Sequence, residues 1–342
     1  MRAMVLQETR AVSAERDSLV LHDLPEPEPK EGEVLIRVAT CGVCHTELDQ
    51  IEGRAALGRL PVIPGHQVVG QVAACGPRVT GVEVGQRVGV PWIFSACGRC
   101  GHCLAGNENL CPDFRATGRD ADGGYAEFMT APAAFVHPVP AVFSDVEAAP
   151  LLCAGAIGYR SLRLAGLHGG MRLGLTGFGA SAHLVLMMVR HRHPDTEVYV
   201  FARRPEERAF ALQLGAAWAG DTQQAAPAKL HAIIDTTPAW LPVIKALENL
   251  EPGGRLVINA IRKEEADKQR LLGLDYARHL WLEKEIKSVA NVARSDVREF
   301  LHLAGEIPLR PVVETYGLSD ANRALLDLKT RHVRGAKVLC VR

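Results

Sequence analysis

The chain has 342 residues, and its 39 Lys and Arg residues are balanced by 39 Asp and Glu residues. This length is sufficient for two domains with cores of their own, and the balanced charge does not favour nucleic acid or an anionic membrane as a partner. Apolar runs such as residues 184–189 are too short to span a bilayer, and the first residues contain no apolar signal segment, so we expect a cytoplasmic protein.

An apolar run at residues 34–38 predicts a strand, and three separate motifs with metal-ligating side chains follow it along the chain. The first contains Cys41 and Cys44, the second contains His66, and the third contains the distant Cys153. Two thiolates and one imidazole can hold a zinc ion whose fourth position stays open, as catalytic zinc sites do. The alternative is that each side chain is a packed core residue, because a single buried Cys or His is more often structural. Sequence separation alone does not assign Cys153 to the same ion.

Four closely spaced cysteines form the strongest local motif of the sequence. They are Cys97, Cys100, Cys103 and Cys111. Thiolates at this spacing can surround one ion as a tetrahedral set, and zinc is the ion that such a set usually selects. We therefore expect a structural zinc in a lobe at residues 95–113. Disulfides and a redox-sensing cluster are the alternatives.

A strand, a glycine-rich turn and a helix follow one another between residues 172 and 190. Residues 172–176 are an apolar run, and residues 183–190 carry a helical pattern. The turn between them fits G-x-G-x-x-A, the pattern of a dinucleotide-binding site. Its residues are Gly177, Phe178, Gly179, Ala180, Ser181 and Ala182. A helix that begins here presents free N–H groups to a pyrophosphate.

The next predicted strand, at residues 197–201, bears on the choice of dinucleotide. In an NAD-binding fold this strand ends in an acidic residue that holds the ribose hydroxyls. Here it is followed by Ala202, Arg203 and Arg204. Two guanidiniums suit a 2′-phosphate, so the sequence favours NADP(H) over NAD(H). The alternative is that Arg204 only flanks a helix that begins at Pro205.

The rest of the pattern predicts an α/β fold with a Rossmann-type, doubly wound parallel sheet. Short strands at residues 232–235 and 255–259 flank a helix at 241–250 and a turn at 252–254, and Val289 belongs to a last strand. Strands and helices that alternate with right-handed crossovers give such a sheet. The N-terminal part shows short β-like runs instead. Residues 318–325 predict a capped helix, and residues 336–341 predict a closing strand.

These motifs together resemble the zinc-dependent medium-chain alcohol dehydrogenases of the yeast and bacterial type. The run from Gly65 through His66, Gly70 and Gly76 is similar to the zinc signature of that family, and the four-cysteine lobe follows at the corresponding place. The resemblance implies a GroES-like, β-rich catalytic domain at residues 1–153 and 293–342, with the Rossmann domain at 154–292. It also implies a homodimer or homotetramer.

The resemblance further implies two zinc ions per chain, one catalytic and one structural. Cys44, His66 and Cys153 match the ligands of the catalytic ion. Glu47 matches a carboxylate that orients the ligand histidine. Thr46 matches the hydroxyl that relays the alcohol proton.

Other matched positions concern the cofactor and the substrate, and two of them depart from the family pattern. His45 matches a contact to the cofactor pyrophosphate, and Trp92 resembles a bulky residue that narrows the pocket toward small primary alcohols or slim aldehydes. Gln67 replaces the usual Glu beside the ligand histidine, which removes one negative charge. Asp49 replaces the histidine that ends the proton relay, and a carboxylate is a weaker base than an imidazole.

We therefore predict a zinc-dependent alcohol dehydrogenase or aldehyde reductase. It would transfer hydride between a primary or secondary alcohol and NAD(P)+ through a zinc-bound alkoxide. One alternative is a related reductase that acts on another carbonyl or on an activated alkene. The other is a non-catalytic zinc-binding module.

Overall fold

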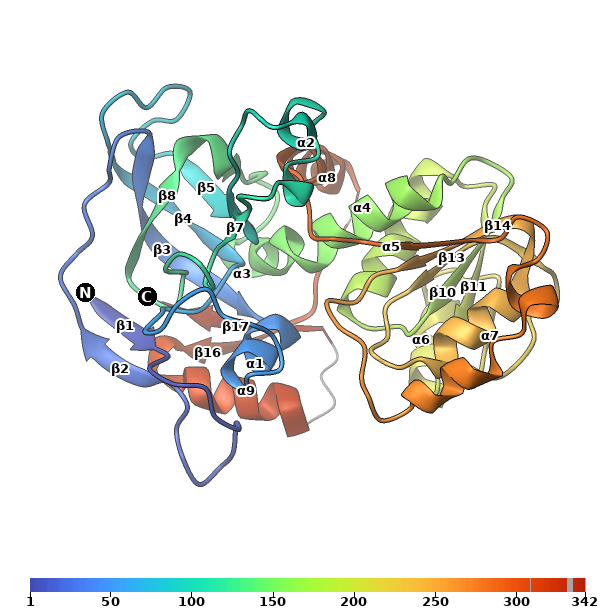
Figure 1. Cartoon of the computed structure of the whole chain (residues 1–342). Coiled ribbons are helices and arrows are strands. Elements are labelled where there is room, and N and C mark those ends of the chain that lie inside the picture. Colours follow the sequence, from blue (N-terminus) through green and yellow to red (C-terminus); the bar gives the residue numbers. More distant parts are fainter. Residues whose placement is uncertain (308, 331–334, 342) are drawn as a thin grey trace. The chain divides into compact units, whose positions relative to one another are not determined.

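The structure of the chain is a computed structural model that describes residues 1–307, 309–330 and 335–341. It divides into two compact units, which Figure 1 colours along the sequence: Met1–Ala156 with Asn291–Arg342 forms the first, and Ile157–Ala290 forms the second. No helix within the described ranges has both the length and the apolar character that a membrane span requires.

A six-stranded parallel sheet forms the core of the second unit. Its strands stand in the order β12-β11-β10-β13-β14-β15, and each neighbouring pair is parallel. The bounds are β10 Arg172–Thr176, β11 Glu197–Phe201, β12 Trp218–Gly220, β13 Leu230–Asp235, β14 Leu250–Ile258 and β15 Glu285–Ser288. Leu173, Ile233 and Leu256 are fully buried. The central strands are apolar because a parallel sheet is covered on both faces.

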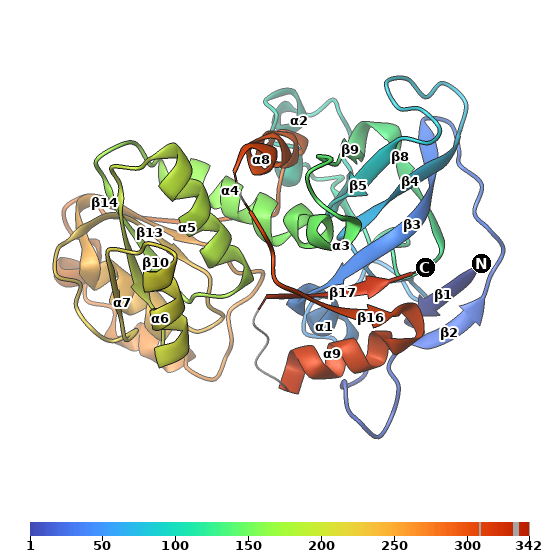
Figure 2. The ribbon, with the colours of Figure 1, turned by 180° about the vertical axis from the view of Figure 1, so that it is seen from behind.

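Three α-helices of this unit connect the strands and cover the sheet. They are α5 (Ala180–Arg192), α6 (Pro205–Gln213) and α7 (Leu241–Asn249). The connections through α5 and α6 lead from β10 outward to β12, whereas α7 leads from β13 outward to β14 in the opposite direction. Because such crossovers are right-handed, α5 and α6 cover one face and α7 covers the other, as Figures 1 and 2 show. The predicted doubly wound, Rossmann-type sheet is confirmed.

The first unit is built around a seven-stranded sheet. Its strands follow the order β16-β17-β3-β4-β5-β9, and β8 pairs with β3. The bounds are β3 Glu33–Val43, β4 Val68–Cys75, β5 Arg87–Val90, β8 Phe128–Pro132, β9 His137–Pro138, β16 Val313–Gly317 and β17 Ala336–Cys340. The long strand β3 pairs with β4, β8 and β17. Its buried side chains, such as Ile36 and Val38, lie in the core of this unit.

Shorter elements complete the two units. The strands are β1 Arg2–Val5, β2 Val20–Asp23, β6 Ile93–Ser95 and β7 Arg115–Ala116. The α-helices are α1 His45–Ile51, α2 Gly101–Leu104, α3 Asp145–Ala148, α4 Ala154–Ala165, α8 Arg294–Glu306 and α9 Ala321–Thr330. Single turns of 3-10 helix include η1 Glu108–Leu110, η3 Ala149–Leu152 and η6 Leu318–Asp320, and a π-helical turn spans Tyr276–Leu280.

The predicted strands at 34–38, 172–176 and 197–201 lie within β3, β10 and β11. Two other predictions were wrong in detail. The predicted turn at 252–254 is instead part of β14, where the pairing register with β13 shifts and Gly253 has φ of 72°. The predicted helix at 318–325 begins as the 3-10 turn η6 and continues as α9 to Thr330.

Candidate active site and metal centres

Three ligating side chains from distant parts of the chain meet in the first unit. The ligand atoms of Cys44, His66 and Cys153 all lie within 4.8 Å of one another, and Cys44 Sγ is 3.6 Å from His66 Nε2. Cys44 is the N-cap of α1, His66 lies in the segment just before β4, and Cys153 is the C-cap of η3. Ligands about 2.0–2.3 Å from one zinc ion have separations of this size. The donor set therefore fits a zinc ion with three protein ligands.

The imidazole of His66 is held by a buried carboxylate. His66 Nδ1 hydrogen-bonds Glu47 Oε1, and both side chains are 1% exposed. The other oxygen of Glu47 accepts the backbone N–H of Cys44 at 3.0 Å. This contact through Nδ1 leaves Nε2 directed at the thiol of Cys44. Glu47 therefore sets both the ring orientation and the nitrogen available to a metal.

The charges of this cluster favour a cation among the three ligands. Burial lowers the pKa of His66, but the Glu47 carboxylate and the Cys44 thiolate raise it, and together they raise it to about 10. The hydrogen bond with Cys153 and burial raise the pKa of the Cys44 thiol well above its usual range. The buried Glu47 carboxylate therefore favours positive charge at this place. A divalent ion that binds here displaces the protons of its ligands and supplies positive charge of its own.

Two glycines let the segments around these ligands approach closely. Gly65, directly before His66, has φ of 101°, and a Cβ there would lie 2.4 Å from the ring of Tyr125. A Cβ on Gly42 would lie 2.5 Å from the side-chain oxygen of Gln67. Gln67 itself is 3% exposed, and its backbone carbonyl accepts the N–H of Gly42 at 3.0 Å. The side chain of Gln67 is thus packed against β3.

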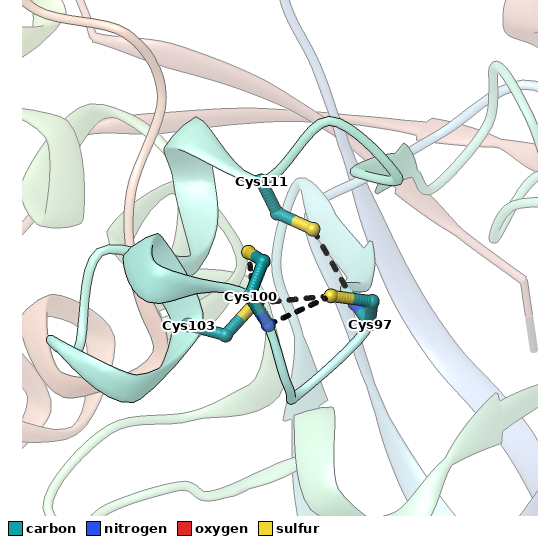
Figure 3. Close-up of side chains that lie close together, drawn as sticks. All are labelled: Cys97, Cys100, Cys103 and Cys111. Carbon is teal, nitrogen blue, oxygen red and sulfur yellow. Dashed lines mark hydrogen bonds between the residues drawn. The ribbon is translucent and has the colours of Figure 1, made fainter.

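Four thiols converge in the lobe between β6 and β7, and Figure 3 shows them directed toward one another. The sulfur of Cys103 is 3.9 Å from that of Cys97 and 3.6 Å from that of Cys100. These distances exceed the roughly 2.05 Å of a disulfide bond, and all nine cysteines are free thiols. The disulfide alternative is therefore not supported. The set of Cys97, Cys100, Cys103 and Cys111 fits a closed, tetrahedral zinc site.

Backbone N–H groups in this lobe point at the sulfurs. Cys97 Sγ accepts the N–H of Cys100 at 3.4 Å, and Cys111 Sγ accepts the N–H of Asp113 at 3.3 Å. Hydrogen bonds from the backbone of Arg99 and Cys100 lower the pKa of Cys97 to about 6, whereas burial raises the pKa of Cys103 to about 12. The loop is therefore arranged to stabilise thiolate charge at its first cysteine.

Trp92 and Thr46 lie beside the three-ligand cluster. The rings of Trp92 and His66 meet edge to face, with centroids 4.8 Å apart at 84°. The Trp92 side chain is buried, and its Nε1 has no acceptor among the described residues. Thr46 is half-buried, and its backbone N–H donates to Cys44 Sγ at 3.3 Å. His45, the first residue of α1, is exposed.

Asp49 is engaged by an ion pair that sequence analysis did not foresee. Its Oδ1 accepts Arg54 Nε at 2.8 Å and lies 2.7 Å from Arg54 Nη2. The backbone N–H groups of Arg54 and Ala55 bond the Asp49 carbonyl. The Asp49 side chain is 6% exposed. A proton that reaches this carboxylate must therefore compete with a guanidinium already bound to it.

In the second unit the glycine-rich turn joins β10 to α5. Gly177 has φ of 76°, and a Cβ there would lie 2.9 Å from the side chains of Thr236 and Thr237. Gly179 is the N-cap of α5, so the first turn of the helix contains Ala180, Ser181 and Ala182. Gly179 is exposed, and a Cβ there would meet no described atom within 4 Å, which leaves space for a ligand against the backbone. Phe178 is buried, and its ring contacts that of Phe210.

Arg203 and Arg204 follow β11 on the surface of the same unit. Both are exposed, and Arg204 is the N-cap of α6. The nearby Arg208 donates to the carbonyls of Ala202 at 2.8 Å and Arg203 at 3.0 Å. The side chains of Arg203 and Arg204 are therefore open to solvent, whereas the guanidinium of Arg208 is hydrogen-bonded to the backbone of this segment.

Comparison with known proteins decides the family. Residues 30–141 match the family described as the alcohol dehydrogenase GroES-like domain. The chain is 44% identical over 320 residues to the probable alcohol dehydrogenase AdhA of Mycobacterium tuberculosis, covering 92% of this chain and 90% of that protein. The chain belongs to the medium-chain zinc alcohol dehydrogenase family.

Two solved structures support the assignment of this alcohol dehydrogenase fold. An NAD-dependent alcohol dehydrogenase matches with a TM-score of 0.87 and 26% identity over 100% of both chains. A cobalt- and zinc-bound alcohol dehydrogenase from Pyrobaculum aerophilum matches with a TM-score of 0.84 and 26% identity over 99% of both chains. The predicted fold class, a GroES-like, β-rich domain together with a Rossmann-type sheet, is confirmed, and the family member is an oxidoreductase.

Sequence analysis missed several polar residues around these sites of the dehydrogenase. Asp235, at the end of β13, accepts the hydroxyls of Thr176 at 2.5 Å and Thr237 at 2.8 Å, and it pairs with Lys263. The one available signal was that Asp235 ends a parallel strand, where ligand sites gather. The guanidinium carbon of Arg119 lies 5.9 Å from the Trp92 ring centroid, and no sequence pattern around Arg119 indicated this position.

Proposed function

We propose that this family member is a zinc-dependent alcohol dehydrogenase or aldehyde reductase. It transfers a hydride from a primary or secondary alcohol to NAD(P)+, and the alcohol also loses a proton, so that an aldehyde or ketone and NAD(P)H result. The observation that carries the proposal is the convergence of Cys44, His66 and Cys153 within 4.8 Å, with no fourth ligating side chain among the residues that the structure describes. A three-ligand zinc site keeps a position for substrate, whereas a four-cysteine site is closed.

Each residue of the cluster has a proposed role. When bound, zinc supplies a Lewis acid that polarises the substrate oxygen and favours loss of its proton. Glu47 holds His66 through Nδ1 and so keeps Nε2 directed at the metal. The hydroxyl of Thr46 would relay the proton that the alcohol loses, accepting it while passing its own proton on. Asp49 is the proposed end of that relay, although Arg54 already binds its carboxylate. Gln67 is buried and neutral, so it adds no charge, and the ligands alone determine the charge that surrounds the metal.

The second unit supplies the proposed coenzyme site. The turn at Gly177–Ala182 and the N-terminus of α5 suit the pyrophosphate. His45 is a further proposed cofactor contact, as the family resemblance implies. We propose NADP(H) over NAD(H), because Arg203 and Arg204 are the first exposed residues after β11 and the first carboxylate follows only at Glu206. The guanidiniums match the charge and geometry of a 2′-phosphate.

Trp92 is the proposed wall of the substrate pocket. Its ring lies edge to face on the His66 imidazole, so a substrate carbon beside the metal would meet this indole. A rigid indole at that distance favours small primary alcohols and slim aldehydes over branched ones. Two alternatives are a reductase of another carbonyl or activated alkene and a non-catalytic zinc-binding module. Metal analysis with a substrate screen distinguishes them.

The test combines metal analysis with a screen of alcohols and aldehydes with both coenzymes. We expect two zinc ions per chain, oxidation of short primary alcohols, and a higher kcat/KM with NADP+ than with NAD+. Replacing both Arg203 and Arg204 with Ser should lower the kcat/KM ratio of NADP+ to NAD+ by about tenfold or more, as loss of charge-assisted hydrogen bonds predicts. The control is Arg270→Ser, an exposed arginine on η4 (Lys268–Gly273). Reduction of alkenes alone, or coenzyme binding without turnover, would establish an alternative instead.

A homodimer or homotetramer is the proposed assembly. Strand β15 ends the order of the six-stranded sheet, and all four of its residues are exposed. Ile286 on this strand is 46% exposed, and the preceding segment carries Trp281 at 54% and Leu272 at 91% exposure. An edge strand with apolar side chains suits pairing with a second copy about a two-fold axis.

Sedimentation of the full chain checks this assembly. The wild type is expected to sediment as a dimer or tetramer, and Ile286→Lys should shift it toward the monomer because a buried lysine at a paired edge is unfavourable. The matched control is Val84→Lys, which changes an exposed apolar side chain of the other unit. A monomeric wild type at micromolar concentration would exclude the assembly.

A further inference from the structure

The guanidinium of Arg119 is a fixed cation that approaches the same aromatic ring as the ligand His66. The guanidinium carbon of Arg119 lies 5.9 Å from the centroid of Trp92, and the same ring lies 4.8 Å from the centroid of His66. These two distances together place the guanidinium no more than about 11 Å from the imidazole centroid. All three side chains belong to the first unit.

The guanidinium retains hydrogen-bonding capacity in this position. Arg119 donates Nε and Nη2 to Asp120 Oδ2 at 3.0 Å and 2.7 Å, and none of the described residues accepts from its Nη1. A guanidinium has five N–H donors, so the pair with Asp120 leaves several of them for a ligand. Asp120 Oδ2 also accepts the backbone N–H of Ala116 at 2.7 Å, which ties that carboxylate to its own loop.

The indole of Trp92, which both the imidazole and the guanidinium approach, supplies a second, independent observation. The Trp92 side chain is 7% exposed, and its Nε1 lies buried without an acceptor among the described residues. Buried donors in native proteins nearly always have a partner. A ligand with an acceptor group in addition to its hydroxyl oxygen could satisfy the indole, whereas an unsubstituted alkyl alcohol brings only the oxygen that the metal would hold.

On this basis, and resting on the proposed alcohol dehydrogenase function, we propose that the substrate carries a carboxylate at the end remote from its hydroxyl or aldehyde group. Arg119 is then a specificity-determining residue that binds this carboxylate, with Trp92 as the wall along which the carbon chain lies. With about 1.5 Å per carbon–carbon bond, a chain of about four to six carbons stays within the upper limit that these two distances set. The substrate class is therefore the ω-hydroxy acids and the corresponding ω-oxo acids.

The experiment compares substrates of one shape that differ in charge. The probes are 5-hydroxypentanoate and its neutral isostere 5-hydroxypentanamide, with 1-pentanol as a reference, each oxidised by the full chain with both coenzymes. We expect the wild type to favour the acid over the amide by about tenfold or more in kcat/KM, because hydrogen bonds to charged groups are the stronger ones. Arg119→Met, which keeps an apolar stem over Trp92, should bring this ratio close to one, and Arg119→Lys should restore part of it.

Arg115 provides the matched control. It lies 5.5 Å over the ring of Phe94 in the same part of the chain, but that ring is not the one that contacts His66. Arg115→Met should therefore keep the preference for the acid. A ratio of one or less in the wild type, or a ratio that Arg119→Met leaves unchanged, overturns the inference. Oxidation of 1-pentanol without oxidation of the acid also overturns the inference, but leaves the proposed function intact. If none of the three alcohols is oxidised, the proposed function is contradicted as well.

Discussion

Replacing Cys153 with alanine is expected to remove one of two zinc ions per chain and to lower kcat/KM for alcohol oxidation by about a thousandfold. Cys153 is the ligand furthest along the chain from Cys44 and His66, yet its ligand atom lies within 4.8 Å of theirs. Loss of one of three protein ligands weakens the site, and the Lewis acid contributes several kcal/mol, where each 1.36 kcal/mol is about tenfold in rate. Zinc content by mass spectrometry and kcat/KM are the two measurements.

A readout independent of turnover comes from cobalt substitution. The wild type loaded with cobalt should show thiolate-to-cobalt absorption from both sites, and Cys153→Ala should lose the share that belongs to the three-ligand site. The matched control is Cys75→Ala, because Cys75 is exposed and lies outside both clusters. If Cys153→Ala kept two zinc ions and full activity, this cysteine would not be a ligand.

The second large effect is expected in the four-cysteine lobe. Cys103→Ser should remove its zinc and lower the melting temperature by about 10 °C, while the zinc at the three-ligand site persists. The lobe has little regular structure of its own: α2 has four residues and η1 has three. Structural zinc contributes directly to folding, and each kcal/mol lost shifts the midpoint of a unit of about 150–250 residues, such as the one that contains this lobe, by about 2–4 °C. Calorimetry with metal analysis checks the result.

A double variant distinguishes a shared metal from four separate packing effects. Because one ion needs all four thiolates, Cys103→Ser with Cys111→Ser should destabilise the protein little more than Cys103→Ser alone. Additive losses would indicate independent packing contributions. Cys75→Ser serves again as the control, since its thiol only donates to the Val82 carbonyl at 3.7 Å. Unchanged zinc content in Cys103→Ser would contradict the closed site.

The parts of the protein that sequence analysis predicted well are those that neighbouring residues determine. The cysteines of the lobe are close in sequence, so a short loop alone can bring Cys97 and Cys103 together. The strand β10 and the turn at Gly177 follow from an apolar run that ends in glycine, because only a residue without a side chain fits beside Thr236 and Thr237. Segment 252–254 shows the limit, since proline and glycine predicted a turn where the sheet accommodates a bulge in β14.

Side-chain contacts that depend on packing were not predicted, even where the two residues are close in sequence. The pairing of Arg54 with Asp49 changes how a proposed proton relay must work, and nothing in the spacing of the two residues indicated it. The position of Arg119 over Trp92 likewise depends on the loop after β7 folding back toward the segment after β5. Such contacts arise from packing, in which each side chain takes the space that other segments leave.

By itself, then, the sequence determined the local motifs: a four-thiolate loop, a dinucleotide-binding turn, and a histidine followed by the glycines of a zinc signature. Only the tertiary structure decided that Cys153 lies with Cys44 and His66, and that a guanidinium stands beside the indole that contacts this histidine. The physical reason is that backbone preferences act over a few residues, whereas a site built from three distant segments exists only after the sheet of the first unit has brought those segments together.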